Sequence, residues 1–374
     1  MFKTPTLENF LPPDDLKVSN PNRKLHHIFN EADCYALWAA YAAGRPLLVR
    51  GKPGTGKSQM AKAIAEQLGW AFVSEVVRGS TELSDLHWHF DAIGRLGEAQ
   101  ARAGQAKEPE KPDPLNPLNF LAPGAFWWAF DWQTAQDQYD KCPCHARPKP
   151  EQPEQWRPET GGVVLLLDEI DKAEPDLPNG LLETLGLYEF TVPYLDHAKQ
   201  AIQTAELKKR HTAPSPAGEG WSEGKTNEAL FSAAAIPSIN PIKADPSQLL
   251  VIITTNEERE LPKAFVRRCF VHTLKMEESA ESINPDAEKP LQKRHDWLMQ
   301  RGRLHFGEQI AELVYLLAAE LLWNDRVAAP HTQYPPGLAE YIDLLNAIKS
   351  LDHQQQLERL EAIAKYALKK DLES

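Results

Sequence analysis

A glycine-rich octet, residues 51–58, has the spacing of a phosphate-binding loop. It reads Gly-Lys-Pro-Gly-Thr-Gly-Lys-Ser and fits the pattern G-x-x-x-x-G-K-[S/T]. Glycines let the backbone wrap closely, so that several N–H groups can point at one phosphate. Lys57 can then reach the β- and γ-phosphates, and the Ser58 hydroxyl can complete a Mg²⁺ shell. The predicted nucleotide-binding residues are Gly51, Pro53, Gly54, Thr55, Gly56, Lys57 and Ser58.

Two adjacent carboxylates, Asp168 and Glu169, follow the apolar run 163–167. In a parallel sheet the carboxyl ends of neighbouring strands open onto the same crevice. Asp168 is therefore expected to face Ser58 and to hold Mg²⁺ with it. Glu169 is expected to act as the base that orients or deprotonates the attacking water. The alternative is an acidic turn that caps the next helix, which is the weaker reading beside a phosphate loop.

A second apolar run, residues 249–253, leads into Thr254, Thr255 and Asn256. A neutral amide at Asn256 can hold the water between Glu169 and the γ-phosphate without adding charge. Further on, Arg267 and Arg268 lie too far along the chain to fold back easily into their own site. They suit a neighbouring subunit's site, where one serves as an arginine finger. The alternative is a basic helix end that interacts with the helix dipole, and we expect one of the two to do only that.

The elements that would position these residues alternate between strands and helices. A helix capped by Asn30 and closed at Gly44 precedes the run at 47–50, and the helix after the loop closes at Gly69. Buried strands alternating with helices predict an α/β fold with a parallel sheet covered on both faces. After residue 275 only helical stripes remain. The expected organisation is a polar arm at 1–25, an α/β nucleotide-binding domain at 26–275 with insertions at about 101–158 and 196–248, and a helical lid at 276–374.

Composition narrows the class of protein. The chain has 374 residues, of which 42% are hydrophobic and 25% charged, as in ordinary globular proteins. A net charge of −12 argues against a surface built mainly to hold nucleic acid phosphates. No run approaches the ~18 apolar residues of a membrane span, and the N-terminus lacks a signal-peptide pattern. Four cysteines suggest no disulfide framework. We expect a cytoplasmic protein without a membrane partner.

Taken together, five sequence blocks resemble the AAA+ ATPase family, and within it the MoxR group. The blocks occur in family order and lie at residues 45–69, 85–100, 163–185, 188–193 and 251–269. The resemblance implies a Walker A loop at 51–58, a Walker B pair at Asp168 and Glu169, sensor 1 at Asn256 and the finger at Arg268 or Arg267. It also implies ATP and Mg²⁺, hexameric rings with nucleotide between subunits, chaperone-like remodelling and a von Willebrand factor type A partner.

The resemblance extends to two hairpins and a lid. Residues 85–96 resemble the group's helix-2 insert, with Leu86, Trp88 and Phe90 alternating as in a strand. Residues 188–195 resemble the pre-sensor hairpin, with Tyr188, Phe190, Val192 and Tyr194 on one face. In the lid, Gly337 or Leu338 stands where the family's sensor 2 arginine would be. Both insertions are longer than the family core requires, which suggests a surface for a dedicated partner.

Weaker signals favour structural roles. Cys142, Cys144 and His145 lie together, but a zinc site usually has four ligands and no second pair is near in sequence. His87 and His89, expected on one strand face, are read as packing or surface residues. The short basic run 207–210 is not a convincing nucleic-acid tract. The aromatic residues Trp127, Trp128 and Phe130 are read as the packed anchor of the first insertion.

The leading functional hypothesis is an ATP-driven homo-oligomeric ring that remodels a protein client. One alternative is a ring motor of a nucleic-acid-targeting or antiviral defence system, and another is a monomeric P-loop switch or small-molecule kinase. ATP is favoured over GTP because no Asn-Lys-x-Asp signature appears.

Overall fold

The computed structural model describes residues 2–11, 16–18, 25–103, 113–142, 148–195, 240–274, 289–328 and 336–368. Its contacts divide the chain into two compact units. The first comprises Met1–Thr81, Pro150–Leu182 and Pro246–Ser374, and the second comprises Glu82–Lys149 and Glu183–Asp245. The weak candidates Cys144, His145 and the basic run 207–210, which the sequence did not favour as sites, lie outside the described residues.

A five-stranded parallel sheet forms the centre of the first unit. Its order is β11 (Phe270–Thr273), β3 (Leu47–Arg50), β10 (Leu249–Thr255), β7 (Val163–Asp168) and β4 (Ala71–Val76). Every residue of β10 is buried, as expected for a central strand covered on both faces. The α/β prediction is confirmed. Strand β11 was not predicted from the sequence, because its four residues closely follow the arginine pair and alternate in burial.

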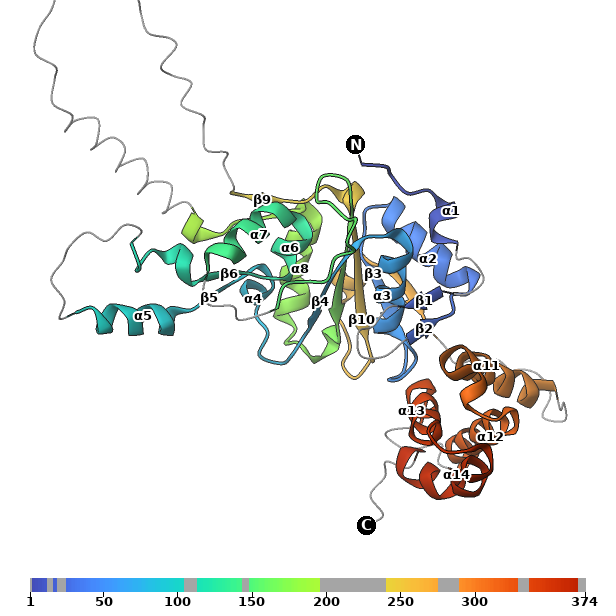
Figure 1. Cartoon of the computed structure of the whole chain (residues 1–374). Helices are drawn as coiled ribbons and strands as arrows, with labels where there is room; N and C mark the ends of the chain where they lie inside the picture. Colours follow the sequence, from blue (N-terminus) through green and yellow to red (C-terminus); the bar gives the residue numbers. More distant parts are fainter. Residues whose placement is uncertain are drawn as a thin grey trace, which may run out of the picture. The chain divides into compact units, whose positions relative to one another are not determined.

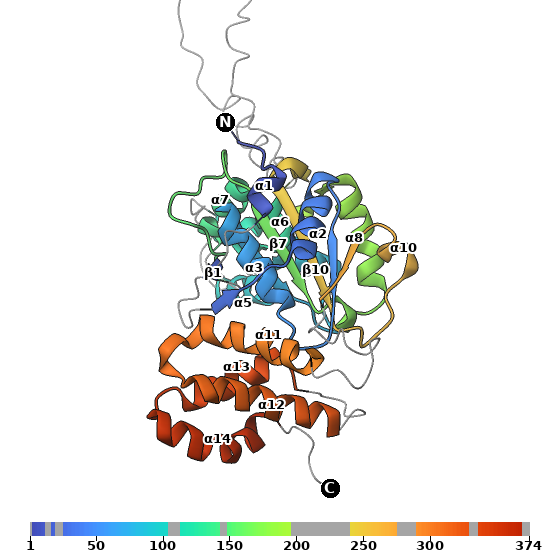
Figure 2. The same ribbon diagram turned by 90° about the vertical axis from the view of Figure 1, so that its right-hand side faces the viewer.

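Helices cover both faces of this sheet (Figures 1 and 2). On one face lie α1 (Leu7–Phe10), α2 (Glu31–Ala42) and α3 (Lys57–Leu68), and on the other lies α8 (Asp176–Leu187). The Asn30 side chain accepts the Asp33 N–H and caps α2, as predicted. The remaining short elements are η2 (Ile170–Lys172), η4 (Pro246–Gln248) and α10 (Lys263–Val266).

The N-terminal segment, expected to be a polar arm, contributes to the core. Phe10 is fully buried, with its ring 5.5 Å from Trp38 and 5.4 Å from Tyr41. Further along, β1 (Leu16–Val18) pairs antiparallel with β2 (Leu25–His27), so a hairpin spans the expected boundary after residue 25. Phe10 therefore packs this segment against the core of the first unit, although several of its other described residues are exposed.

Four helices follow the sheet in the first unit. They are α11 (Lys289–Phe306), α12 (Glu312–Ala328), α13 (Leu338–Ile348) and α14 (His353–Leu368), with η5 (Gly307–Gln309) between the first two. They share a core of their own, with Val314, Leu345 and Leu360 buried. Leu313 and Leu357 match the helical spacing of the sequence but are 53% and 38% exposed, so they are not buried with this core. None of the described helices is long and apolar enough to span a membrane.

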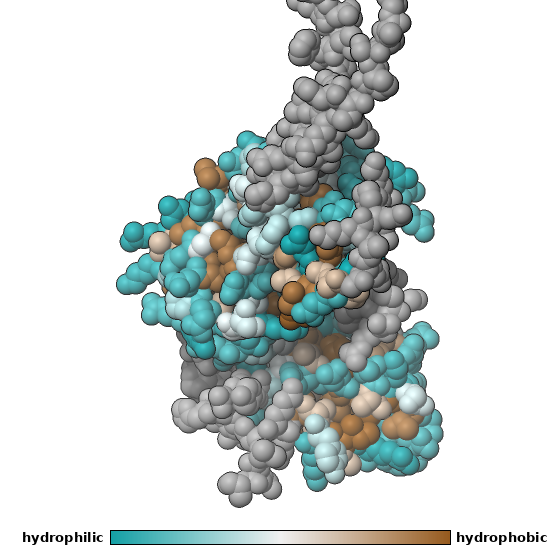
Figure 3. Space-filling view, turned by 90° about the vertical axis from the view of Figure 1, so that its left-hand side faces the viewer, coloured by the Kyte–Doolittle hydropathy of each residue, from teal (hydrophilic) through white to brown (hydrophobic). Residues whose placement is uncertain are grey.

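The second unit contains two small hairpins and an aromatic core. β5 (Trp88–Phe90) pairs with β6 (Leu121–Pro123), and β8 (Glu189–Phe190) pairs with β9 (Ile242–Lys243), both antiparallel. The helices are α4 (Leu83–His87), α5 (Ala92–Ala101), η1 (Pro117–Phe120), α6 (Ala125–Phe130) and α7 (Trp132–Lys141). The face drawn in Figure 3 is mostly hydrophilic, with separate apolar patches between hydrophilic residues.

Two local predictions in the second unit need correction. Leu86 and His87 end helix α4 instead of belonging to a strand, so the alternation holds only from Trp88 to Phe90. His87 therefore does not share a strand face with His89. Its ring stacks on Phe190 with centroids 4.3 Å apart, so tertiary aromatic packing overrides the local pattern. The predicted aromatic anchor is confirmed, because Trp127, Trp128 and Phe130 are all buried.

The predicted one-face alternation in residues 188–195 is also only partly correct. The strand covers Glu189 and Phe190, and a helical turn covers residues 193–195. The ring of Tyr194 stacks on that of Phe90, 4.2 Å away. The two hairpins of the second unit are therefore joined through aromatic contacts.

Candidate functional site

The loop at 51–58 joins the end of β3 to the start of α3. Gly56 has φ 91 and Gly51 has φ 152, a conformation that side chains rarely adopt. A Cβ at Gly51 would also lie 2.6 Å from the carbonyl oxygen of Leu274. Glycine is therefore required for the turn and for the close approach of the chain that follows β11.

Lys57 is buried beneath this loop, with 6% of its surface exposed. Its Nζ donates to the carbonyl oxygens of Gly51 and Lys52, at 2.6 and 3.0 Å, and to Oδ1 of Asn256 at 2.7 Å. An ammonium group has three donors, and these contacts engage all of them. Burial lowers the pKa of Lys57, while the nearby carboxylates of Asp168, Asp171 and Glu169 oppose that shift.

Ser58 and Asp168 meet at the ends of α3 and β7. The Ser58 hydroxyl lies 2.8 and 3.0 Å from the two carboxylate oxygens of Asp168. Asp168 also accepts a hydrogen bond from the hydroxyl of Thr254, on the neighbouring strand β10. A hydroxyl and a carboxylate are hard oxygen ligands of the kind that Mg²⁺ prefers, so these two side chains fit the predicted magnesium site.

Glu169 follows β7 in a left-handed conformation, with φ 60 and ψ 47. Its N–H donates to the hydroxyl of Thr254 at 3.0 Å. One carboxylate oxygen accepts from Lys172 at 2.7 Å and the other from the Asn256 amide at 3.3 Å. The hydrogen bond to Glu169 raises the pKa of Lys172. The carboxylate expected to act as a base is thus held beside the amide expected to hold water.

These predicted residues converge on one pocket of about 470 Å³. Its lining includes Pro53, Gly54, Thr55, Gly56, Lys57, Ser58, Asp168, Glu169 and Asn256. Gly51 is not part of the lining, but it contributes through its carbonyl bond to Lys57. These side chains come together at the carboxyl ends of strands β3, β7 and β10. This agrees with the expectation that the carboxyl ends of parallel strands open onto one crevice.

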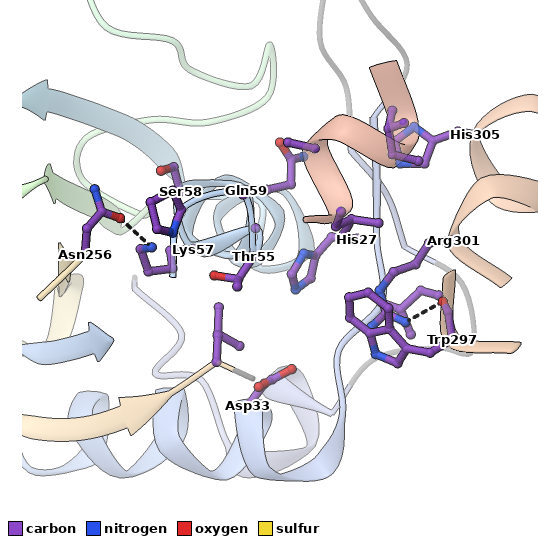
Figure 4. A pocket seen from close by; sticks show the side chains of 18 of the residues that line it. His27, Asp33, Thr55, Lys57, Ser58, Gln59, Asn256, Trp297, Arg301 and His305 are labelled. Atoms are coloured by element: carbon purple, nitrogen blue, oxygen red, sulfur yellow. Dashed lines mark hydrogen bonds between the residues drawn. The ribbon is translucent and has the colours of Figure 1, made fainter. Parts of the chain in front are cut away.

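Several lining residues were not predicted from the sequence. Figure 4 shows His27, Trp297 and Arg301 at the end of the pocket away from Asn256. Nε2 of His27 is buried without a hydrogen-bond partner in the structure, and burial lowers the pKa of His27 to about 4. The guanidinium of Arg301 lies over the Trp297 ring, 3.7 Å from its centroid. No local motif marks these residues, since they approach the loop only through tertiary structure.

The start of α13 lies against the phosphate loop. A Cβ at Gly337 would lie 3.5 Å from the carbonyl oxygen of Pro53, and one at Gly54 would lie 3.3 Å from a carboxylate oxygen of Glu340. Gly337 and Leu338, one of which stands where the resemblance predicts a sensor 2 arginine, are thus near the loop and supply no arginine there. Among the described residues, the one arginine that lines the pocket is Arg301, on α11.

Arg267 and Arg268 lie away from this pocket's lining. Arg267 lines a second pocket, of about 480 Å³, together with Arg50, Arg259 and Lys263. The carbonyl oxygens of both arginines accept hydrogen bonds from the guanidinium of Arg45, at 2.9 Å for Arg268. Neither arginine reaches its own nucleotide pocket, as expected from its place in the chain.

A P-loop nucleotide-binding domain is defined by three features that this chain combines: the phosphate loop, the acidic end of β7 and the parallel sheet. The AAA domain of the dynein-related subfamily matches residues 46–269, which is more than half of the chain. The chain therefore belongs to the AAA family, and this family implies nucleotide binding.

The other comparisons add little. A search of curated proteins finds no match. A crystal structure from Cytophaga hutchinsonii, of a protein described as a candidate ATPase, is similar at 15% identity over 88% of this chain and 78% of that one. Its TM-score is 0.30.

Proposed function

We propose that the chain hydrolyses ATP with Mg²⁺ in the pocket beneath its phosphate loop. The observation that carries this proposal is that Asn256, at the end of β10, lies 2.7 Å from Lys57, at the start of α3, and 3.3 Å from Glu169, just after β7. A fold that only bound phosphate would not need a carboxylate and an amide beside the lysine.

Each side chain has a distinct part in the proposed reaction. Lys57 exchanges its bonds to the Gly51 and Lys52 carbonyls for the β- and γ-phosphates. Glu169 accepts a proton from water that the Asn256 amide orients. Ser58 and Asp168 would hold Mg²⁺, which would supply positive charge to the phosphates when bound.

The proposed active form is a homo-oligomeric ring, with six subunits as in the family it resembles. Arg268, or Arg267, then stabilises phosphoryl charge in the adjacent subunit's pocket. Two features support this assignment. Both arginines lie outside their own pocket's lining, and Arg267 lines a separate pocket whose charged residues are Arg50, Arg259, Lys263, Glu257 and Glu260.

Within the family, we propose membership of the MoxR group and chaperone-like remodelling of a protein client. A von Willebrand factor type A protein is the expected partner, and the cytoplasm the expected location. The five sequence blocks named above support the group assignment. The second unit, with its two hairpins joined by aromatic contacts, is the part of the chain that we assign to partner or client contact.

Assembly-dependent turnover tests this function. Phosphate release is measured from the full chain at increasing protein concentration, and particle size is followed by size-exclusion chromatography with ATP. We expect turnover per chain to rise as the ring forms and to disappear in Glu169→Gln. Full turnover by a lasting monomer would favour the monomeric switch instead.

A further inference from the structure

The carboxyl ends of β7 and β10 are tied together by side chains in both directions. From this arrangement we propose that Thr254 and Asp171 are positioning residues that hold Glu169 opposite Asn256. The inference rests on the proposed ATPase function and adds two residues to it. Neither residue is expected to touch the nucleotide, because neither lines the pocket.

Backbone pairing alone does not fix the two strand ends against each other. The β7–β10 register runs from Val163 opposite Leu249 to Leu167 opposite Ile253. Asp168, Glu169 and Asn256 all lie beyond the last of these pairs. Some other contact must therefore set the distance between the carboxylate of Glu169 and the amide of Asn256.

Thr254 supplies the contact from β10 to β7. Its side chain is fully buried in a strand of otherwise mainly aliphatic residues, where an unbonded hydroxyl would be costly. The hydroxyl donates to the Asp168 carboxylate and accepts the Glu169 N–H at 3.0 Å. One oxygen atom thus contacts both members of the acidic pair.

The bond to the Glu169 N–H matters because Glu169 is strained. A left-handed backbone is unfavourable for a residue with a Cβ, and it persists only where the surroundings hold it. Without the Thr254 hydroxyl, Glu169 loses an acceptor that stabilises this conformation. Relaxation of its backbone would turn the carboxylate away from Asn256.

Asp171 supplies the contact in the opposite direction. It lies in η2, just after β7, and is 2% exposed. Its carboxylate oxygens accept the N–H of Asn256 at 3.3 Å and that of Glu258 at 2.9 Å. Glu257, between these two residues, also has a left-handed backbone, with φ 62. The Asp171 carboxylate in η2 therefore stabilises the strained turn after β10, as the Thr254 hydroxyl stabilises the one after β7.

Substitution of Thr254 or Asp171 is therefore expected to lower turnover without lowering the affinity for nucleotide. Small displacements of a catalytic group from its productive position lower rates by roughly 10- to 100-fold. The hydrogen bonds of the Thr254 hydroxyl go to Asp168 and Glu169 and not directly to the phosphate loop, so binding of ATP should persist. A residue with only a structural role would lower stability without separating kcat from binding.

The test compares Thr254→Val, which has nearly the same shape, with Thr254→Ser, which keeps the hydroxyl. Thr184→Val is the matched control, since Thr184 is a buried threonine whose hydroxyl lies 2.9 Å from Nε2 of His87 and takes no part in the pocket. Full-length proteins are compared by kcat, by Kd for a fluorescent ATP analogue and by thermal unfolding. Asp171→Asn provides an independent variant if Thr254→Val fails to fold.

We expect Thr254→Val to lower kcat roughly 10- to 100-fold with Kd changed less than twofold, and Thr254→Ser and Thr184→Val to retain turnover. Unchanged kcat in both Thr254→Val and Asp171→Asn would overturn the proposal. So would a parallel loss of binding and turnover.

Amide hydrogen exchange separates this proposal from the proposed function. In the absence of nucleotide, peptides covering 163–172 and 249–258 should exchange faster in Thr254→Val than in wild type. Faster exchange in Thr254→Val, together with a wild-type chain that hydrolyses no ATP, would support the positioning role of Thr254 and refute the proposed ATPase function. Identical exchange in Thr254→Val and wild type would refute the positioning role, whatever turnover is measured.

Discussion

The ammonium of Lys57 donates a 2.7 Å hydrogen bond to Oδ1 of Asn256, a residue 199 positions further along the chain. The same amide donates through Nδ2 to Glu169 at 3.3 Å. Asn256 therefore lies between the cation that would bind phosphate and the carboxylate that would activate water. This contact, drawn as a dashed line in Figure 4, joins the ends of three strands into one site.

Replacing Asn256 should impair hydrolysis more than binding. Asn256→Ala removes the group that would hold water, so kcat should fall about 100-fold, as for other losses of one well-placed polar group. The Kd for ATP should change only a few-fold, because the Gly51 and Lys52 carbonyls still position Lys57. Single-turnover kinetics and equilibrium binding separate the two effects. Equal losses of both would assign Asn256 to binding alone.

Asp168→Asn should weaken the response to Mg²⁺. The substitution removes a negative charge from the pair that Asp168 forms with Ser58, and charge is the main attraction for a hard cation. The Mg²⁺ concentration for half-maximal turnover should rise at least about tenfold. Nucleotide binding in EDTA should be retained, which serves as the control. An unchanged Mg²⁺ titration would contradict the assignment.

Acid should destabilise the second unit through His87. Burial lowers the pKa of His87 to about 4, from 6.5. The unfolded chain therefore binds more protons between pH 6.5 and pH 4, and stability falls as the pH falls through that window. The full effect is on the order of 3 kcal/mol.

His87→Phe keeps an aromatic ring beside Phe190 but cannot titrate. Urea unfolding at pH 7.5 and pH 5, monitored in both proteins, should show a smaller pH dependence in the variant. A variant whose stability falls with acid as steeply as that of wild type would show that His87 is not responsible.

Phe10→Ala should destabilise the first unit by about 3–5 kcal/mol, the usual range for a buried aromatic residue. The reason is that Phe10 is fully buried against Trp38 and Tyr41. Leu11→Ala is the control, since Leu11 is 39% exposed. Chemical denaturation of both variants checks the prediction. Similar stabilities would mean that the segment before residue 12 lies outside the folded core.

Local patterns predicted the elements that form the candidate nucleotide pocket, because each combines a strong strand signal with characteristic polar residues. Gly51 to Ser58 were placed by their glycine and lysine spacing, and Asp168-Glu169 by their position after an apolar run, since parallel strand ends share a crevice. The helix cap at Asn30 was equally local. Features that depend on tertiary packing, and not on neighbours in the sequence, could not be predicted in this way.

Three misses illustrate that limit. Strand β11 is short and becomes a strand by pairing with β3. Arg301 reaches the pocket from a helix far along the chain, without a motif of its own. Thr254 looked like part of an apolar strand, and its importance depends on the conformation of Glu169, which no sequence pattern reveals.

Mixing two inactive variants tests the central claim most directly. Glu169→Gln removes the proposed base and Arg268→Ala the proposed finger, so neither should turn over ATP alone. In a randomly mixed ring, some pockets with an intact Glu169 face a neighbour with an intact Arg268, and roughly a quarter of the wild-type rate should return. Failure of the mixture to regain turnover, or near wild-type turnover by Arg268→Ala alone, would contradict a site completed by the adjacent subunit.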